Sequence, residues 1–70
     1  MKHVALNSSV IRSVGYFEDT CTLGVCFTNG SKYQYSGVPM AMFVELINAE
    51  SAGEYFDKNI KDFYEHEREV

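Results

Sequence analysis

Hydrophobic and polar positions alternate through the first half of the chain, a pattern typical of strands with one covered face. In the clearest stretch, Leu23, Val25 and Phe27 lie on one side, and small or polar residues fall between them. β-Branched and aromatic residues are also frequent in the preceding segment, and Glu18-Asp19 form a polar turn between the two. We therefore predict strands over Val10–Phe17, Cys21–Phe27 and Ser31–Val38.

An Asn-Gly pair at positions 29 and 30 separates the second and third strands, and the loop length decides which face Tyr33 and Tyr35 join. A two-residue loop places both rings on the outer face, away from Leu23 and Val25. A three-residue loop, with Gly30 in the left-handed conformation, pairs Val25 with Tyr33 and Leu23 with Tyr35, so that both rings enter the core. We favour this second register because a domain this small can scarcely leave two large rings unburied.

The second half of the chain changes to helical spacing. Pro39 suits the first position of a helix, where its missing N–H would be unpaired in any case. Ser51-x-x-Glu54 has the spacing of a capping box, in which the hydroxyl and the carboxylate accept free backbone N–H groups at the start of a second helix. We predict a first helix over Pro39–Glu50, with Met40, Phe43, Leu46 and Ile47 as its apolar stripe, and a second to about Tyr64, with Phe56, Ile60, Phe63 and Tyr64.

These elements predict an α+β fold in which a three-stranded antiparallel meander is followed by two helices packed on one face. We expect residues 1–70 to form a single domain with an ordered core of about residues 8–64, and both ends, including Glu65–Val70, to fray. The outer strands of such a meander leave free edges that another chain can pair with.

Composition and charge narrow the class of protein. With 70 residues, 46% of them hydrophobic, the chain can bury one small core. No apolar run approaches the roughly 18 residues of a membrane-spanning helix, so a cytoplasmic protein is the default expectation. The net charge is −4, and the segment from Glu54 onward contains six acidic and three basic residues. Phosphate binding depends on clustered Lys and Arg, so this balance counts against a nucleic-acid partner.

Catalytic and metal-binding motifs are not recognisable. His3 and His66 lie near opposite ends of the chain, where we expect both side chains to be solvated and unable to support a nucleophile. Cys21 and Cys26 are predicted on opposite faces of one strand as reduced thiols, and their C-x4-C spacing has no second ligand pair. We therefore expect no enzyme activity, no metal and no cofactor.

Residues suited to binding are easier to find. The alternate spacing of Tyr33 and Tyr35 places two rings on one face, where they could stack on bases, fill a partner's pocket or pack under a helix. Arg12 and Lys61 offer local positive charge. The amide of Asn59 both donates and accepts, which suits recognition or a tie between the second helix and a neighbouring backbone group.

Several short motifs occur in a characteristic order between Val4 and Lys61. They are Ser8-Ser9-x-Ile11, Gly15-Tyr16, Leu23-x-Val25-x-Phe27, Asn29-Gly30, Tyr33-x-Tyr35, Val38-Pro39 and Ser51-x-Gly53-x-Tyr55-Phe56-x-x-Asn59-Ile60. Together they resemble the KTSC domain, found at the C-terminus of some lysyl-tRNA synthetases and as stand-alone bacterial or phage proteins. The resemblance implies a small domain for which the synthetase context suggests RNA binding, and it places the family positions on Tyr33, Tyr35, Ser51, Gly53, Phe56, Asn59, Ile60 and Lys61.

This chain departs from the KTSC pattern at Ala52, where a Lys commonly follows the serine, and in the acidic tail at residues 62–67. Both differences remove positive charge.

One hypothesis for the function is a non-catalytic module that binds RNA or tRNA. The alternative is a protein-interaction module, such as a bacterial or phage adaptor or inhibitor, that uses a free sheet edge or the Ser51–Lys61 helix. A free edge would also permit a homodimer, and a small-ligand pocket between the sheet and the second helix is a third hypothesis. The candidate binding residues are Tyr33, Tyr35, Arg12, Ser51, Gly53, Asn59 and Lys61.

Overall fold

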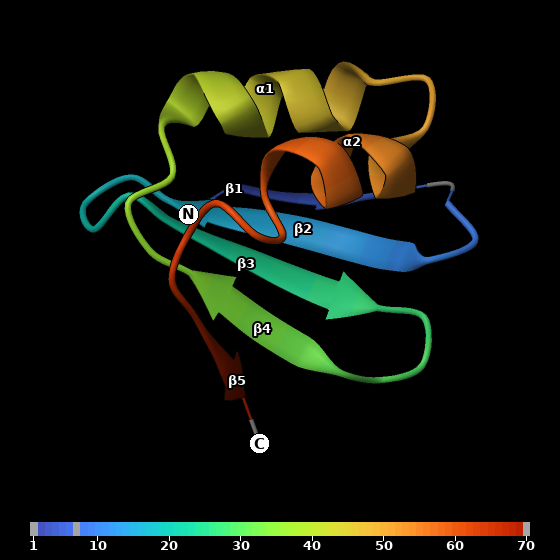
Figure 1. Ribbon diagram of the computed structural model, residues 1–70, viewed down its shortest axis with the longest axis horizontal. Helices are drawn as coiled ribbons and strands as arrows, with labels where there is room; N and C mark the ends of the chain where they lie inside the picture. The colour runs from blue at the N-terminus through green and yellow to red at the C-terminus, as the bar shows by residue number, and fades with distance from the viewer. Residues whose placement is uncertain (1, 7, 70) are drawn as a thin grey trace.

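The computed structural model describes residues 2–6 and 8–69, with the side chains of residues 4–6 and 8–68. An antiparallel sheet of five strands, in the order β1-β2-β3-β4-β5, carries both helices on one face (Figure 1). The predicted α+β class is confirmed. The elements are β1 (Lys2–Ala5), β2 (Ile11–Phe17), β3 (Thr22–Phe27), β4 (Lys32–Tyr35), α1 (Met40–Asn48), α2 (Ala52–Asn59) and β5 (His66–Glu69).

The β3–β4 hairpin has the register that brings both tyrosines to the covered face. Leu23 pairs with Tyr35 and Val25 with Tyr33, as the three-residue loop predicts. Gly30 has a φ of 93°, a left-handed conformation that glycine adopts without strain. Tyr35 is only 3% exposed, and Tyr33 beside it is half-buried. The preference for this register is therefore confirmed.

A β-bulge at Arg12 sets the inward face of β2. Ile11 pairs with Phe27 while Ser13 pairs with Cys26, so Arg12 is one extra residue on β2. Plain alternation would put Ile11 and Val14 on opposite faces, but the extra residue brings both to the buried side.

The core lies between this face of the sheet and the two helices. The Tyr16 ring stacks on Phe43 of α1 at 5.4 Å between centroids, and its hydroxyl donates to the buried Val38 carbonyl at 2.6 Å. Burial raises the pKa of Tyr16. Leu46 is also buried, as the α1 stripe predicts. The buried hydrophobic residues are Ile11, Val14, Tyr16, Leu23, Val25, Tyr35, Val38, Phe43, Leu46, Ala52, Phe56 and Ile60.

The prediction of three strands is wrong, because the sheet has five. β1 pairs with β2, and β5 pairs with β4, so each outer edge of the predicted meander is covered. A homodimer formed through a strand edge would therefore need β1 or β5. Cys21 also lies outside the strand predicted for it, in the turn before β3, with a φ of 52°.

The helix boundaries differ from the prediction mainly at the end of α2. Pro39 is the N-cap of α1 and not its first residue, and α2 ends at Asn59 and not near Tyr64. The chain then reverses so that the Ser36 N–H donates to the Glu65 carbonyl at 2.9 Å and β5 joins the sheet. Phe63, predicted on the apolar stripe, is 67% exposed for this reason.

Half of the predicted capping box forms at the start of α2. The Ser51 hydroxyl accepts the Glu54 backbone N–H at 3.3 Å, whereas the Glu54 carboxylate pairs with Lys58 one turn later at 2.7 Å. None of the helices in the part of the chain that the structure describes is long and apolar enough to span a bilayer.

Candidate functional site

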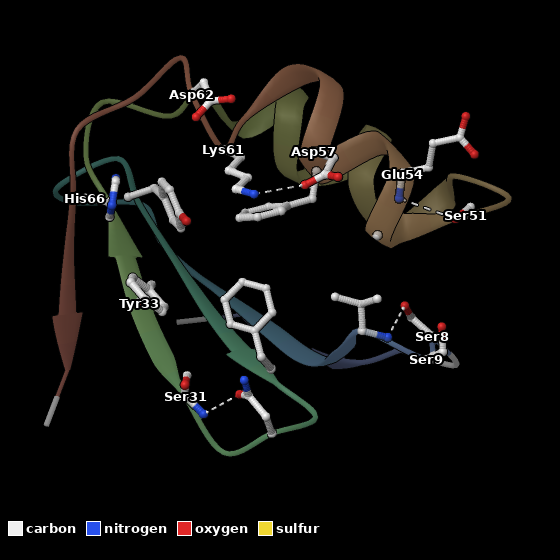
Figure 2. Close-up of a pocket in the computed structure, with 16 residues that line it drawn as sticks. Ser8, Ser9, Ser31, Tyr33, Ser51, Glu54, Asp57, Lys61, Asp62 and His66 are labelled. Atoms are coloured by element: carbon white, nitrogen blue, oxygen red, sulfur yellow. Dashed lines mark hydrogen bonds and ion pairs between the residues drawn. The ribbon is translucent and has the colours of Figure 1, made fainter.

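A groove of about 590 Å³ lies between the helix-covered side of the β3–β4 hairpin and α2 (Figure 2). The segment before β2 forms one wall, and β5 with the turn before it closes the opposite end. We call this feature the α2 groove. Its size falls in the range of small-ligand and side-chain pockets.

Aromatic side chains from three strands and α2 form the floor of the groove. Phe27 packs edge-on to Tyr33 and Phe56, with centroids 5.7 and 5.5 Å apart. Tyr35 packs edge-on to Phe56 at 5.2 Å. The His66 ring reaches from β5 to 5.1 Å from Tyr35 and 5.7 Å from Tyr33. Tyr33 and His66 retain exposed surface, whereas Tyr35 and Phe56 are buried.

The wall before β2 is held in place by Ser8 and by a close approach of α2. The Ser8 hydroxyl accepts the backbone N–H groups of Val10 and Ile11 at 3.2 and 3.3 Å. A Cβ added to Gly53 would lie 3.4 Å from the Val10 Cβ and 3.6 Å from the Ser8 Oγ. These are ordinary contact distances, so α2 packs against this wall at Gly53 with room for a methyl group, and Val10, which is 50% exposed, remains at the groove surface.

The charged side chains around the groove are mainly acidic. Carboxylates of Glu54, Asp57 and Asp62 line it, against the single ammonium of Lys61. Lys61 points back toward Asp57, with 3.8 Å between Nζ and Oδ1, and both side chains are more than half exposed (Figure 2). The hydrogen bond between Lys58 and Glu54 lowers the pKa of Glu54 and raises that of Lys58.

The surroundings of Tyr35 raise the pKa of its hydroxyl. Burial raises its pKa, and Tyr33 and the Asp62 carboxylate contribute in that order. Tyr35 therefore stays protonated and neutral beneath the groove at physiological pH. Among the described residues, no group of three or more His, Cys, Asp or Glu side chains is placed to hold a metal ion.

The structure gathers most of the predicted binding residues around the groove. Two of them do not line it. Arg12 is exposed on the bulge, and the Asn59 amide donates to the Tyr55 carbonyl at 3.2 Å, which ties down the end of α2. The predicted residues that line the groove are Tyr33, Tyr35, Ser51, Gly53 and Lys61.

His66 is the main residue that sequence reasoning missed. Its side chain is exposed, as expected, but β5 places its ring against both tyrosines. The alternation of charged residues in the tail gave no sign of this. Ser8 and Ser9 also line the groove, although the sequence marks them only as part of a family motif. The side chain of His3 lies outside the described part of the chain.

A family model described as the KTSC domain matches residues 7–64. The chain belongs to the KTSC domain family. It is 41% identical over 61 residues to an uncharacterized protein of Stutzerimonas stutzeri, covering 87% of this chain and 86% of that one. A KTSC domain protein of Yersinia pestis, solved by crystallography, has the same fold with a TM-score of 0.91 and 33% identity, covering 99% of this chain and 97% of that chain.

This KTSC domain is also similar to part of a much larger enzyme. It is 42% identical over 60 residues to a lysine–tRNA ligase of Trichormus variabilis, which covers 86% of this chain but 11% of the ligase. Several of the motifs that resemble the family lie far apart in the sequence but meet at the α2 groove. Those with residues in its lining include Ser8-Ser9, Tyr33-x-Tyr35 and Ser51-x-Gly53.

Proposed function

We propose that this KTSC domain is a non-catalytic module that binds a segment of a partner protein in the α2 groove. The observation that carries the proposal is the position of Tyr35. Its ring is 3% exposed and lies between Phe56 and His66, at 5.2 and 5.1 Å. A ring enclosed in this way cannot stack on a nucleobase, so the tyrosine pair is not a base-binding platform.

The remaining features of the groove support a protein ligand. An aromatic floor, an exposed valine at the wall and several hydroxyl groups at the rim match the mixture of apolar and hydrogen-bonding contacts in peptide recognition. Three carboxylates against one ammonium would repel a phosphate backbone. A cytoplasmic setting is part of the proposal, and the free cysteines Cys21 and Cys26 support it.

RNA binding is the second candidate, favoured by the similarity to lysine–tRNA ligases. Such binding would use surface charge outside the aromatic floor. Its affinity for tRNA should fall steeply with increasing salt, because counterions are released when phosphates are neutralised.

One set of titrations distinguishes the protein-binding function from the RNA-binding function. Short displayed peptides are selected on the immobilised domain, and the best peptide and total tRNA are then titrated into ¹⁵N-labelled protein. We expect the peptide to shift amide resonances of Phe27, Tyr33 and His66, which line the groove. Saturable, salt-sensitive tRNA binding without any peptide that shifts these resonances would contradict the proposal.

A matched pair of substitutions locates the interface. Val10 at the groove and Val44 on α1 are 50% and 44% exposed, so glutamine is tolerated at either position. Val10→Gln should weaken the selected peptide about fivefold by removing apolar contact area. Val44→Gln should leave its affinity unchanged. Equal effects would place the peptide elsewhere on the domain.

A further inference from the structure

Resting on the proposed function of the α2 groove, we propose that the partner residue held there is an arginine. Its guanidinium would replace the Lys61 ammonium beside Asp57 and contact the exposed part of the aromatic floor at Tyr33 and His66. This assigns to Lys61 the role of an internal competitor for the ligand, opposite to the anion-binding role that its charge alone suggests.

Charge complementarity is the first argument. The groove is lined by the carboxylates of Glu54, Asp57 and Asp62 and by one ammonium, that of Lys61. Glu54 already has a close partner in Lys58 at 2.7 Å. Among the described residues, Asp57 pairs with Lys61 alone, at 3.8 Å, and both side chains are more than half exposed. An exposed pair at this distance contributes little stability, so an incoming cation can displace Lys61.

The shape and chemistry of the floor favour guanidinium over ammonium. Tyr33 is half-buried and His66 is exposed, and both offer ring surface next to the charged rim. A guanidinium is planar, weakly hydrated and able to stack on a ring while donating two parallel hydrogen bonds to a carboxylate. The hydroxyl oxygens of Ser9, Ser31 and Ser51 add acceptors around the same opening.

The proposal predicts the sign of a substitution effect. Lys61→Gln removes the competing cation and should tighten an arginine ligand about threefold, whereas it would weaken an anionic ligand. Lys58→Gln is the matched control. Lys58 forms an i,i+4 pair with Glu54 within α2, as Lys61 does with Asp57 just beyond the end of the helix, and both lysines are more than half exposed, but Lys58 does not line the groove. Both substitutions change the net charge by one, so a difference between them reports position.

The test uses ¹⁵N-labelled full-length protein and three probes: the capped tripeptide Ala-Arg-Ala, the same tripeptide with neutral citrulline in place of arginine, and inorganic phosphate. We expect the arginine peptide to shift groove resonances at millimolar concentration, with citrulline at least tenfold weaker. Lys61→Gln should tighten the arginine peptide more than Lys58→Gln, which frees the Glu54 carboxylate but leaves the Lys61 ammonium in the groove.

Three results would overturn the inference. These are equal binding of the arginine and citrulline peptides, no groove shifts up to tens of millimolar arginine peptide, and phosphate binding at the groove that Lys61→Gln weakens. The broader function is tested separately with the display-selected peptide. If that peptide binds the groove and loses nothing on exchange of arginine for citrulline, the arginine inference fails and the protein-binding function stands. If no peptide binds, both fail.

Discussion

Gly53 and Val10 lie so close that a Cβ added to the glycine would be 3.4 Å from the Val10 Cβ. This contact joins the first turn of α2 to the segment before β2, and Ser8 lies at the same junction. Two motifs from opposite ends of the sequence thus meet at one wall of the α2 groove. The distance between them sets how far the groove opens at that wall.

The free energy of unfolding should show that the space at Gly53 accepts a methyl group but not a larger side chain. Gly53→Ala places its methyl at an ordinary contact distance and gains helix propensity, so the free energy of unfolding should change by less than about 1 kcal/mol. Gly53→Val adds branches that meet Val10 and Ser8 and should cost about 1–3 kcal/mol. Urea denaturation of both variants measures the difference. Equal stability of the two would show that the contact is not tight.

The hydroxyl of Tyr16 is expected to stabilise the core through its hydrogen bond to Val38. Tyr16→Phe leaves that buried carbonyl without its 2.6 Å donor and should lower the free energy of unfolding by about 1–3 kcal/mol. Tyr33→Phe is the control, since Tyr33 is half-buried at the groove. Chemical denaturation should show a clear loss for the first variant alone, and comparable losses would count against a special role for the Tyr16 bond.

Tyr55 should make stability depend on pH in the alkaline range. Its hydroxyl donates to Glu45 at 2.6 Å, and this hydrogen bond, with burial, raises the pKa of Tyr55 to about 12 from its ordinary 10.0. Because the folded-state pKa is raised, the stabilisation is complete below pH 10 and is lost as pH rises through about 12. Tyr55→Phe should be about 1 kcal/mol less stable at neutral pH and should lack this alkaline loss.

Unfolding curves of the wild type and Tyr55→Phe across this pH range provide the measurement. Glu45→Gln is a second variant that keeps an acceptor oxygen and removes the charge, so Tyr55 should ionise closer to its ordinary pKa, as read from tyrosinate absorbance. Parallel pH profiles for wild type and Tyr55→Phe would mean that the contact between α1 and α2 does not stabilise the fold.

His66 should stabilise the groove floor through its ring. Its centroid lies 5.1 Å from Tyr35 and 5.7 Å from Tyr33, and ring pairs of this kind contribute about 0.5–1.5 kcal/mol. His66→Ala should therefore lower stability by about 1 kcal/mol and shift the ring-proton resonances of both tyrosines. Glu67→Ala, at the adjacent position in β5, should do neither. Unchanged tyrosine resonances in His66→Ala would contradict the observed packing.

The covered face of the sheet could be predicted because side-chain pattern and turn chemistry agree there. Leu23 and Val25 alternate with smaller residues, and an Asn-Gly loop selects the register that buries Tyr35. The spacing of Phe43 and Leu46 likewise predicts the buried side of α1. Local and tertiary preferences point the same way at these positions.

Other parts of the fold depend on pairing that side chains do not reveal. β1 and β5 are four-residue strands that gain their hydrogen bonds from the edges of β2 and β4. The charged sequence of β5 resembles a solvated tail, and the apolar spacing of Phe63 resembles a helix that continues. Without β5, the sequence gives no reason to place His66 beside the tyrosines or to expect that this end of the groove is closed. A groove does lie between the sheet and the second helix, where the pocket hypothesis places it, and Tyr33, Ser51 and Lys61 all line it.

Because Arg12 is an extra residue in β2, the effect of a deletion in this strand depends on its position relative to the bulge. Deleting Arg12 would leave Ile11 and Val14 two positions apart, so plain alternation would keep both side chains in the core and only the bulge would be lost. Deleting Gly15, in the regular part of the strand, would instead place Val14 and Tyr16 on opposite faces and should be far more harmful. Sequence comparisons within the family should therefore place single-residue gaps in β2 at the bulge or in the flanking turns, and none between Val14 and Tyr16.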